Sequence, residues 1–491
     1  MSVTMTSAEE MGPSVVLNAV ESYRGTITDL DTARVLTGDS FAASREALGA
    51  ALRKRGLASG DRVLLAISNG PLFVGALASI LAAEGCPLLV HSKTPGGELL
   101  RYARRFGTRF LATDSLGEHS PVSMAKLDAN IEFADHWVLH LWRFDETDVA
   151  CTGPVLRGIP LHPTSGSTGL PKVALRPAQA AMEEARHYAE TMEIDEHDTV
   201  IAVPPMTHAY GYGVCVMLPL LTGANIVTTR RLTANSVVRS IEEHRATILP
   251  VVPATLDTLI MSGKSADFRR LRHILSAGAM LTRRSAERFL EKTSVIPCPL
   301  YGTTETGGIA VGIPGDISAV DGRIGPPMNG VEVKACPAPQ MPGLGLGKLA
   351  VRTTSMMRGY LHDDGLVTFP GSDGWFETGD LAVISPDGAI NLRGRDSEVL
   401  NVFGLKVVPC EVEDALLQLD GVFEVKVYGA EHTWGCQIIK AAVVARNGLS
   451  EGHVRAHCER QLVYYKRPQL IFMLPEFARL TNGKIDVSRL P

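Results

Sequence analysis

Apolar and polar positions alternate with two periods along the first three hundred residues of the chain. Short apolar runs, typical of buried strands, are followed by stretches with the three-to-four-residue spacing of amphipathic helices. The pattern predicts strands over 62–67, 109–112, 199–203, 247–252 and 295–300, and helices over 72–83, 237–244 and 285–293. This alternation predicts an α/β fold of doubly wound layers with parallel sheets.

The pattern changes near residue 325, where short strands at 331–335 and 348–352 and a turn at Pro386-Asp-Gly388 predict a small β-rich part. Beyond residue 394 a compact α+β domain is expected, with helices over 410–418 and 451–462 and strands over 424–428, 437–445 and 469–474. We therefore expect an N-terminal domain over 1–394, a hinge at 395–397 and a mobile C-terminal domain over 398–491.

Composition narrows the class of protein. A chain of 491 residues exceeds what one hydrophobic core usually serves, which also indicates at least two domains. The net charge is −5 and the basic residues are dispersed, so neither nucleic acid nor a membrane is an expected partner. Eight cysteines form no CxxC pair, and Glu9 and Glu10 replace the basic and apolar start of an export signal. We expect a reduced, cytoplasmic enzyme.

The most informative segment is Thr164-Ser-Gly-Ser-Thr-Gly-Leu-Pro-Lys172. Glycines let backbone N–H groups approach an anion, hydroxyls add donors and the lysine adds positive charge, so the segment predicts a polyphosphate loop. It is not a Walker A loop, because only two residues separate Gly166 from Gly169 and Val173 follows the lysine. Taken alone, the segment also fits an ordinary Gly/Ser surface turn.

Three later segments decide between these interpretations: Tyr301-Gly-Thr-Thr-Glu-Thr306, Gly374-Trp-Phe-Glu-Thr-Gly-Asp-Leu381 and Asn482-Gly-Lys-Ile-Asp486. Together and in this order the motifs resemble the adenylate-forming superfamily. Its members include acyl-CoA synthetases, luciferases, stand-alone acyl or aryl acid ligases and the adenylation domains of peptide synthetases. Such enzymes join a carboxylate to the α-phosphate of ATP and release pyrophosphate, which requires cations to stabilise the charge that builds on phosphorus.

The resemblance implies an ATP site built from the glycine-rich loop, the adenine slot and the ribose-binding pair. The residues that match these parts are Thr164, Ser165, Gly166, Ser167, Thr168, Gly169 and Lys172 for the phosphates, Gly278, Ala279, Tyr301, Gly302 and Thr303 for the adenine side, and Asp380 and Arg395 for the ribose. Glu305 matches the carboxylate that helps to hold Mg²⁺, and Thr304 the donor to the α-phosphate.

Lys484 matches the lysine that reaches from the small domain to bridge the substrate carboxylate and the α-phosphate. A charge that binds the transition state more tightly than the ground state accelerates this step. Family members then rotate the small domain, which would withdraw Lys484 and present Gly404 and Lys406 to the second nucleophile.

The resemblance also places the pocket for the carboxylic acid. Its expected lining is mostly small and apolar and comprises His208, Ala209, Tyr210, Gly211, Val252, Ala277, Gly307 and Gly308. Amino-acid-activating relatives carry an aspartate where this chain has Ala209, so a buried α-ammonium would lack its partner and an α-amino acid is disfavoured. His208 resembles the residue that stacks near the substrate carboxylate in acyl and aryl ligases.

The acceptor of the acyl group stays open at this stage. The resemblance favours the thiol of coenzyme A. An amine, giving an amide, and the phosphopantetheine of a separate carrier protein are the alternatives. Two positions depart from the family pattern: Ser397 occupies the hinge position, where Asp or Lys is usual, and Val173 replaces the glycine after the loop lysine.

Overall fold

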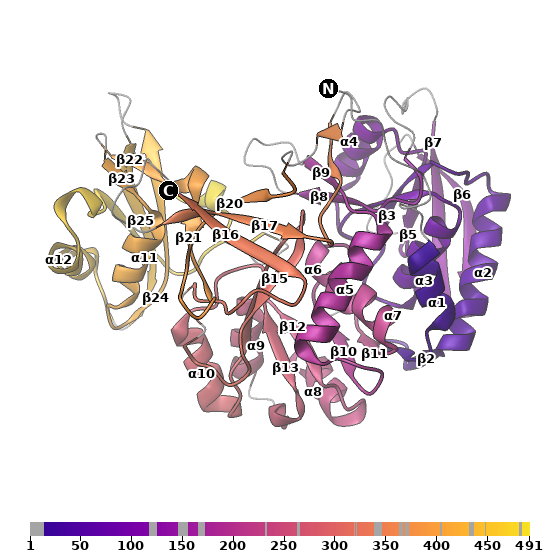
Figure 1. Ribbon diagram of the computed structural model, residues 1–491, viewed down its shortest axis with the longest axis horizontal. Helices are drawn as coiled ribbons and strands as arrows, with labels where there is room; N and C mark the ends of the chain where they lie inside the picture. Colours follow the sequence, from indigo (N-terminus) through magenta and orange to yellow (C-terminus); the bar gives the residue numbers. More distant parts are fainter. Residues whose placement is uncertain are drawn as a thin grey trace.

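The computed structural model contains a nine-stranded sheet, an eight-stranded sheet, and a smaller β-rich and C-terminal part (Figure 1). The two large sheets are interleaved along the chain, because β1 and β2 belong to the eight-stranded sheet and β18 and β19 to the nine-stranded one. The structure describes residues 14–116, 125–145, 156–164, 172–230, 233–262, 266–318, 320, 322–337, 346–362, 367–368, 373–402, 405–431, 437–446, 448–480 and 484–491.

The first sheet has the strand order β19-β18-β9-β8-β4-β3-β5-β7-β6. Its strands are β3 Arg62–Ala66, β4 Cys86–Leu89, β5 Phe110–Thr113, β6 Ala125–Phe133, β7 Trp137–Phe144, β8 Leu161–Thr164, β9 Lys172–Leu175, β18 Gly359–Leu361 and β19 Val367–Thr368. Strands β5, β3, β4 and β8 are parallel, whereas the pairs towards both edges are antiparallel.

The second sheet has the order β15-β14-β13-β12-β10-β11-β1-β2. Its strands are β1 Thr26–Asp29, β2 Arg34–Thr37, β10 Thr199–Ala202, β11 Asn225–Thr228, β12 Ile248–Val251, β13 His273–Ser276, β14 Cys298–Thr303 and β15 Gly307–Val311. The six central strands are parallel, but β2 and β15 pair antiparallel with their neighbours. The expected α/β layers with parallel strands are confirmed, and the sheet also has antiparallel edge strands, because the short connections before β2 and β15 close hairpins.

Helices cover both faces of the two large sheets. The largest apolar cluster combines side chains of both sheets with those of α1 Ser14–Ser22, α2 Gly38–Lys54, α3 Pro71–Ala82, α5 Ala178–Met192 and α7 Leu218–Thr222. Every residue of α3 except the last is buried, as expected for a helix that is apolar all round. Separate clusters lie under α4 Gly96–Phe106 and under α8 Ala234–Glu243, α9 Pro253–Met261 and α10 Arg283–Thr293.

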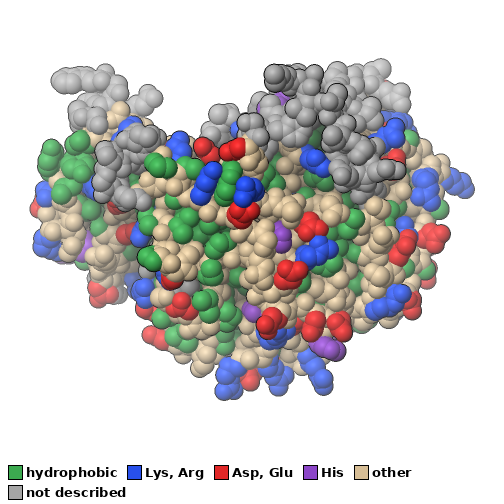
Figure 2. All heavy atoms as spheres, in the orientation of Figure 1, with side chains coloured by type: hydrophobic (Ala, Val, Ile, Leu, Met, Phe, Trp, Pro, Cys, Tyr) green, Lys and Arg blue, Asp and Glu red, His purple; other side chains and the backbone are tan. Residues whose placement is uncertain are grey.

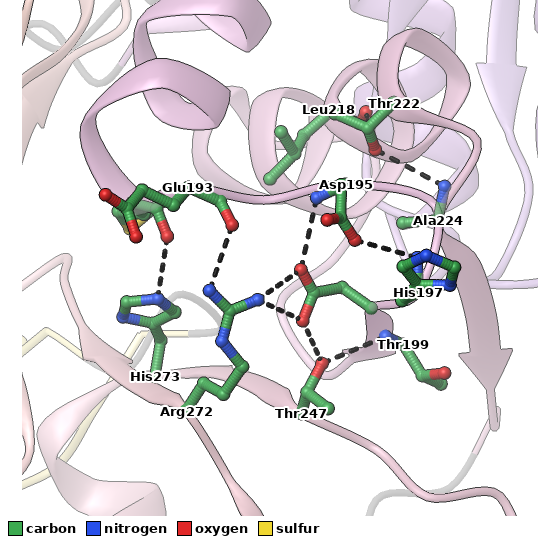
Figure 3. Close-up of polar contacts among 12 residues, drawn as sticks. Glu193, Asp195, His197, Thr199, Leu218, Thr222, Ala224, Thr247, Arg272 and His273 are labelled. Atoms are coloured by element: carbon green, nitrogen blue, oxygen red, sulfur yellow. Dashed lines mark hydrogen bonds and ion pairs between the residues drawn. The ribbon is translucent and has the colours of Figure 1, made fainter.

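A closed polar network fixes the amino ends of the central parallel strands (Figure 3). The buried Asp198 accepts hydrogen bonds from Arg272 Nη1 at 2.7 and 2.9 Å and from Thr247 Oγ1 at 2.7 Å. Arg272 Nη2 donates to the carbonyl of Glu193 at 2.9 Å, just beyond α5. These contacts connect the amino ends of β10, β12 and β13 to the end of α5. The carboxyl ends of the same strands take no part in this network.

The predicted β-rich part is a four-stranded antiparallel sheet of β16 Val331–Pro337, β17 Gly347–Thr353, β20 Phe376–Ile384 and β21 Ile390–Arg395. It is followed by the pair β22 Leu400–Val402 and β23 Leu405–Val407, and then by β24 Val422–Glu431, β25 Gln437–Ala445 and β26 Leu470–Leu474 with α11 Pro409–Leu417 and α12 Glu451–Gln461. These C-terminal elements share an apolar core of their own.

Arg284 joins the layer of the eight-stranded sheet to the C-terminal domain. Arg284 on α10 donates to the carbonyl of Val422 and stacks over the ring of Phe423, with 3.8 Å between its guanidinium carbon and the ring centroid. Among the described residues, no helix is both long and apolar enough to cross a membrane. Acidic and basic side chains are interspersed over the face drawn in Figure 2.

Candidate active site

The carboxyl ends of three neighbouring parallel strands gather the residues expected to line the acid pocket. His208 follows β10, Val252 follows β12, and Ala277 and Gly278 follow β13. The Ala277 N–H donates to the carbonyl of Val251 at 3.1 Å, and a Cβ on Gly278 would lie 3.5 Å from Val252 Cγ1. This placement follows the general rule that open α/β sheets bind ligands at the carboxyl ends of their strands.

The short helix α6 Ala209–Tyr212 carries the next part of the expected lining. Gly211 packs against the preceding loop, since a Cβ there would stand 2.2 Å from the carbonyl oxygen of Pro205. The Tyr210 hydroxyl donates to the carbonyl of Leu275 at 2.8 Å, which draws α6 over the end of β13. A π-helix over Gly213–Met217 continues the helix into α7.

The β14–β15 hairpin brings together most of the Tyr301–Gly308 motif. Tyr301, Gly302 and Thr303 end β14, Thr304 and Glu305 form the turn, and Gly307 and Gly308 begin β15. The Thr303 hydroxyl accepts from the Thr306 N–H at 3.2 Å, which closes the turn. Thr304 and Glu305 are consequently held at the tip of a rigid hairpin.

Asp380 is oriented by two other residues of the expected nucleotide site. Tyr301 Oη donates to Asp380 Oδ2 at 2.6 Å, and Arg395 Nε lies 3.0 Å from Asp380 Oδ1 across the β20–β21 ladder. Burial raises the pKa of Asp380, although the Arg395 guanidinium and the Tyr301 hydroxyl oppose the shift. The structure thus unites Tyr301, Asp380 and Arg395, which lie far apart in the sequence.

The phosphate end of the site is only partly described. Ser165, Gly166, Ser167, Thr168 and Gly169 lie outside the described residues, whereas Thr164 ends β8 and Lys172 begins β9. Lys172 Nζ lies 5.1 Å from the centroid of the Tyr360 ring, and Tyr360 Oη donates to Glu305 Oε1 at 2.6 Å. Tyr360 therefore connects the loop lysine with the hairpin glutamate.

Lys484 reaches this group from the C-terminal domain. Its pKa is lowered, first by loss of solvation and then by Arg395, while Asp380, Glu398 and Glu305 act in the opposite direction. Gly404 lies outside the described residues, as do Asn482 and Gly483 of the terminal motif, whereas Lys406 is exposed on β23. Ala279 is also exposed, next to Gly278.

The His208 side chain is neutral at pH 7 and lies near Lys484. Burial, the neighbouring His91 and the Lys484 ammonium together lower the pKa of His208 to about 4. The two imidazole rings lie 6.2 Å apart between centroids. Nε2 of His208 is buried and has no hydrogen-bond partner within the part of the chain that the structure describes, so it could serve as a contact for a bound molecule.

Sequence reasoning missed Tyr360, His91 and Asn69. The Asn69 amide donates to the carbonyls of Ala202 and Pro204 at 2.8 and 2.9 Å and accepts from the Met206 N–H at 2.8 Å, which shapes the loop before His208. None of the three belongs to a motif with a fixed spacing to the others. Only the pairing of β18 with β9 brings Tyr360 to the site, and local patterns carry no signal for it.

Residues that could hold a metal are few. Within the described ranges, no group of three or more His, Cys, Asp and Glu side chains could hold a metal ion. Glu305 uses Oε1 to accept from Tyr360, which leaves Oε2 for another contact. One carboxylate oxygen suits a magnesium ion that takes most of its remaining ligands from phosphates and water.

Comparison with known proteins agrees with this arrangement. Residues 18–361 match the family described as AMP-binding enzyme, and residues 411–484 match its C-terminal domain. A 4-coumarate–CoA ligase of Arabidopsis thaliana is 23% identical over 497 aligned positions, covering 94% of this chain and 86% of the ligase.

Solved structures share the fold at lower sequence identity. ATP-bound MatB from Rhodopseudomonas palustris is 20% identical with a TM-score of 0.80, and the alignment covers 97% of this chain and 98% of that structure. The amide bond synthetase McbA from Marinactinospora thermotolerans is also 20% identical, with a TM-score of 0.81 and the same coverage. On the family match and the arrangement of these residues, the chain belongs to the AMP-binding enzymes and is an ATP-dependent adenylate-forming ligase.

Proposed function

We propose that this protein uses ATP and Mg²⁺ to adenylate a carboxylic acid without an α-amine and then transfers the acyl group to the thiol of coenzyme A. The observation that carries the proposal is the convergence of Lys484 with Asp380, Arg395, Glu305 and His208 around one site. Lys484 comes from the C-terminal end of the chain and the other residues precede it, so the site combines positive charges of the kind that an enzyme joining two anionic substrates needs.

In the first half-reaction, Lys484 would supply the positive charge that the acid carboxylate and the α-phosphate share. Two anions repel one another, so a mobile cation between them lowers the barrier more than it stabilises either anion alone. Thr304 would add a donor to the α-phosphate from the tip of the hairpin. Asp380, preset by Tyr301 and Arg395, would accept hydrogen bonds from the ribose hydroxyls.

Glu305 would hold the magnesium ion through Oε2, together with the outer phosphates. When bound, the ion would neutralise charge on the departing pyrophosphate. Thr164 and Lys172, together with the loop residues from Ser165 to Gly169, would bind the same phosphates. Tyr360 would hold Glu305 through its hydroxyl and Lys172 against its ring.

The acid class follows from the charges in the pocket. His208 is neutral at pH 7 because its pKa is about 4, and Ala209 offers no carboxylate to an ammonium. A buried ammonium without a partner is costly, so aromatic or medium-chain acids that lack the α-amine fit better. The sum of these features favours acyl or aryl acids over amino acids.

The second half-reaction would follow rotation of residues 398–491 about the segment 395–397. Arg395 ends β21, and the next turn, Asp396–Glu398, is held by an ion pair of 2.7 Å between Lys348 Nζ and Asp396 Oδ2. Rotation would break this pair and bring Gly404 and Lys406 to the acyl adenylate. Ser397 in this turn is the feature that keeps an amine acceptor as the second candidate.

Replacing Gly404 by Leu tests the acceptor. A bulky side chain should spare pyrophosphate release but block thioester formation, because a thiol arm needs a narrow tunnel that a small amine does not. Gly97→Leu is the matched control, since a Cβ at this exposed glycine meets no atom within 4 Å. Efficient amide formation with a simple amine by the wild type, without thioester formation at saturating coenzyme A for any adenylated acid, would refute the coenzyme A proposal.

A further inference from the structure

A group of buried polar side chains lies directly behind the β14–β15 hairpin. It comprises Arg176 after β9, Glu184 on α5, His162 on β8 and Tyr212 on α6, and we call it the inner polar cluster. Arg176 is 0% exposed, Glu184 and His162 are each 1% exposed and Tyr212 is 0% exposed. Arg176 Nη2 donates to Glu184 Oε2 at 2.7 Å and more weakly to the carbonyl of Ser355 at 3.4 Å.

Several polar atoms of the inner polar cluster lack a hydrogen-bond partner among the described residues. Arg176 Nε and Nη1, both ring nitrogens of His162 and the Tyr212 hydroxyl are buried without a hydrogen-bond partner among the described residues. The His162 ring packs edge-on against Tyr212 at 4.9 Å between centroids, and burial holds the pKa of His162 well below its usual value. Buried polar groups are normally paired, so this concentration of unpaired atoms indicates a missing partner.

The inner polar cluster borders residues expected to line the acid pocket. A Cβ on Gly307 would lie 2.6 Å from Glu184 Cδ and 2.9 Å from Arg176 Nη2. The Gly308 N–H donates to Glu184 Oε1 at 3.0 Å. His162 lies within the electrostatic reach of both Arg176 and His208. The cluster therefore adjoins the expected acid pocket at Gly307 and Gly308 and lies near His208.

The unpaired atoms are mostly donors. Arg176 offers three N–H groups on Nε and Nη1, Tyr212 offers one O–H, and a neutral His162 offers one N–H and one acceptor nitrogen. Glu184 already balances the charge of Arg176 and accepts from Gly308. What the cluster lacks is thus an acceptor.

We propose that the inner polar cluster binds an acceptor oxygen, a carbonyl or a carboxylate, at the end of the acid substrate remote from the carboxyl group that is adenylated. This inference rests on the proposed adenylation of a non-amino acid, but not on the identity of the acyl acceptor. It makes Arg176, His162 and Tyr212 specificity-determining residues. A site built to hydrogen-bond a substrate group rejects the analogue that lacks the group, because its own donors would then stay unpaired. Ordered water is the competing partner.

Matched acids distinguish a substrate from water. The panel contains the para-isopropyl, para-acetyl and para-carboxy forms of 3-phenylpropanoate, and octanoate with 7-oxooctanoate and octanedioate. We expect the wild type to show a kcat/KM for pyrophosphate release at least about tenfold higher for an acceptor-ended acid than for its apolar counterpart. The acetyl and carboxy arms show whether a neutral or an anionic oxygen is preferred.

Two variants test the assignment of residues. Tyr212→Phe removes one donor and keeps the ring, and Arg176→Lys keeps a charge opposite Glu184 but removes the planar fork of donors. Each should cut the preference for acceptor-ended acids by about fivefold or more. Thr108→Val is the matched control, because it removes an unpaired buried hydroxyl elsewhere in the fold and should leave the preference unchanged.

Pyrophosphate release without any acceptor separates this inference from the choice between thiol and amine, which thioester and amide assays decide. Binding is also read as the rise in melting temperature with each acid alone, which requires no turnover. The inference is overturned if the wild type uses the apolar acids as well as or better than the acceptor-ended acids. It is also overturned if Tyr212→Phe and Arg176→Lys lose the same activity towards both kinds of acid. In either case water is the partner of the cluster. Failure of every acceptor-ended acid to bind or react would do the same.

Discussion

The two ends of the central parallel strands differ in how completely their polar atoms are paired. At the amino ends, Asp198 collects hydrogen bonds from Arg272 and Thr247, and Arg272 reaches the carbonyl of Glu193 (Figure 3). At the carboxyl ends, His208 Nε2, Ser276 Oγ and Thr207 Oγ1 are buried without partners in the described structure. A saturated network stabilises the fold, whereas unpaired groups weaken it and are available to a ligand. We infer that the amino ends of this sheet serve stability, and we propose that its carboxyl ends serve binding.

The largest expected effect is catalytic. Lys484→Ala should lower pyrophosphate release by about 10²-fold or more, because it removes a charge used in the transition state. The melting temperature should hardly change. Lys440→Ala, on β25 of the same domain, is the control and should leave the rate unchanged. A rate for Lys484→Ala within a few-fold of the wild type would contradict the role of this lysine.

At the amino ends the expected effect is on stability. Asp198→Ala should lower the free energy of unfolding by about 2 to 3 kcal/mol, because the buried Asp198 carboxylate pairs with the exposed Arg272 and its loss leaves Thr247 without an acceptor. Asp267→Ala, which breaks an exposed pair with Arg269, should cost clearly less. Denaturant unfolding measures both. Equal losses in the two variants would show that the network is not a special source of stability.

The depressed pKa of His208 predicts a pH effect on stability. Its pKa is about 4 in the folded protein and about 6.5 in the unfolded chain, so between these values the unfolded chain binds more protons. Folding stability therefore falls as the pH is lowered from 6.5 towards 4. When the pH is lowered from 7 to 5, the free energy of unfolding of His208→Gln should fall by about 1 to 2 kcal/mol less than that of the wild type. If the wild type and His208→Gln lose the same free energy of unfolding between pH 7 and pH 5, His208 does not cause the pH effect.

The smallest expected effect compares single hydroxyls at the two ends. Ser276→Ala should change the free energy of unfolding by no more than about 0.5 kcal/mol, since its hydroxyl has no partner to lose among the described residues. Thr247→Val should cost about 1.5 kcal/mol, since its hydroxyl donates to Asp198 and accepts from the Thr199 N–H. A larger loss in Ser276→Ala than in Thr247→Val would reverse the comparison.

Much of the fold could be predicted from local pattern. The strand expected over 437–445 coincides with β25, and the helix expected over 285–293 lies within α10. The expected strands did not include β6, although its residues alternate strictly between apolar and polar, or β7, which is mostly apolar. The antiparallel edges of both large sheets were also missed, because edge pairing depends on which strands meet and periodicity along the chain does not report that.

The site divides in the same way. Motif residues such as Tyr301, Asp380 and Arg395 could be named from the sequence, and the structure brings them into contact. Arg176 and His162 gave no signal, because a single arginine at the end of an apolar run and a single histidine within one look like many others. Arg176 and His162 stand out only because the fold brings β8, β9 and α5 together, which the sequence does not reveal.

The pairing of β18 with β9 also has a consequence for synthesis of the chain on the ribosome. The Arg176 side chain and the Ser355 carbonyl that it contacts are 179 residues apart, and Tyr360 joins Lys172 only when β18 pairs beside β9. Domains generally fold as units during synthesis. When the glycine-rich loop has left the ribosome, Tyr360, which orients Glu305, has not yet been made. Long-range pairing of this kind is slow. The expected nucleotide site is therefore among the last parts of the N-terminal domain to form, and a truncated chain that ends before β18 would carry the loop but lack Tyr360, which orients Glu305, the proposed metal ligand.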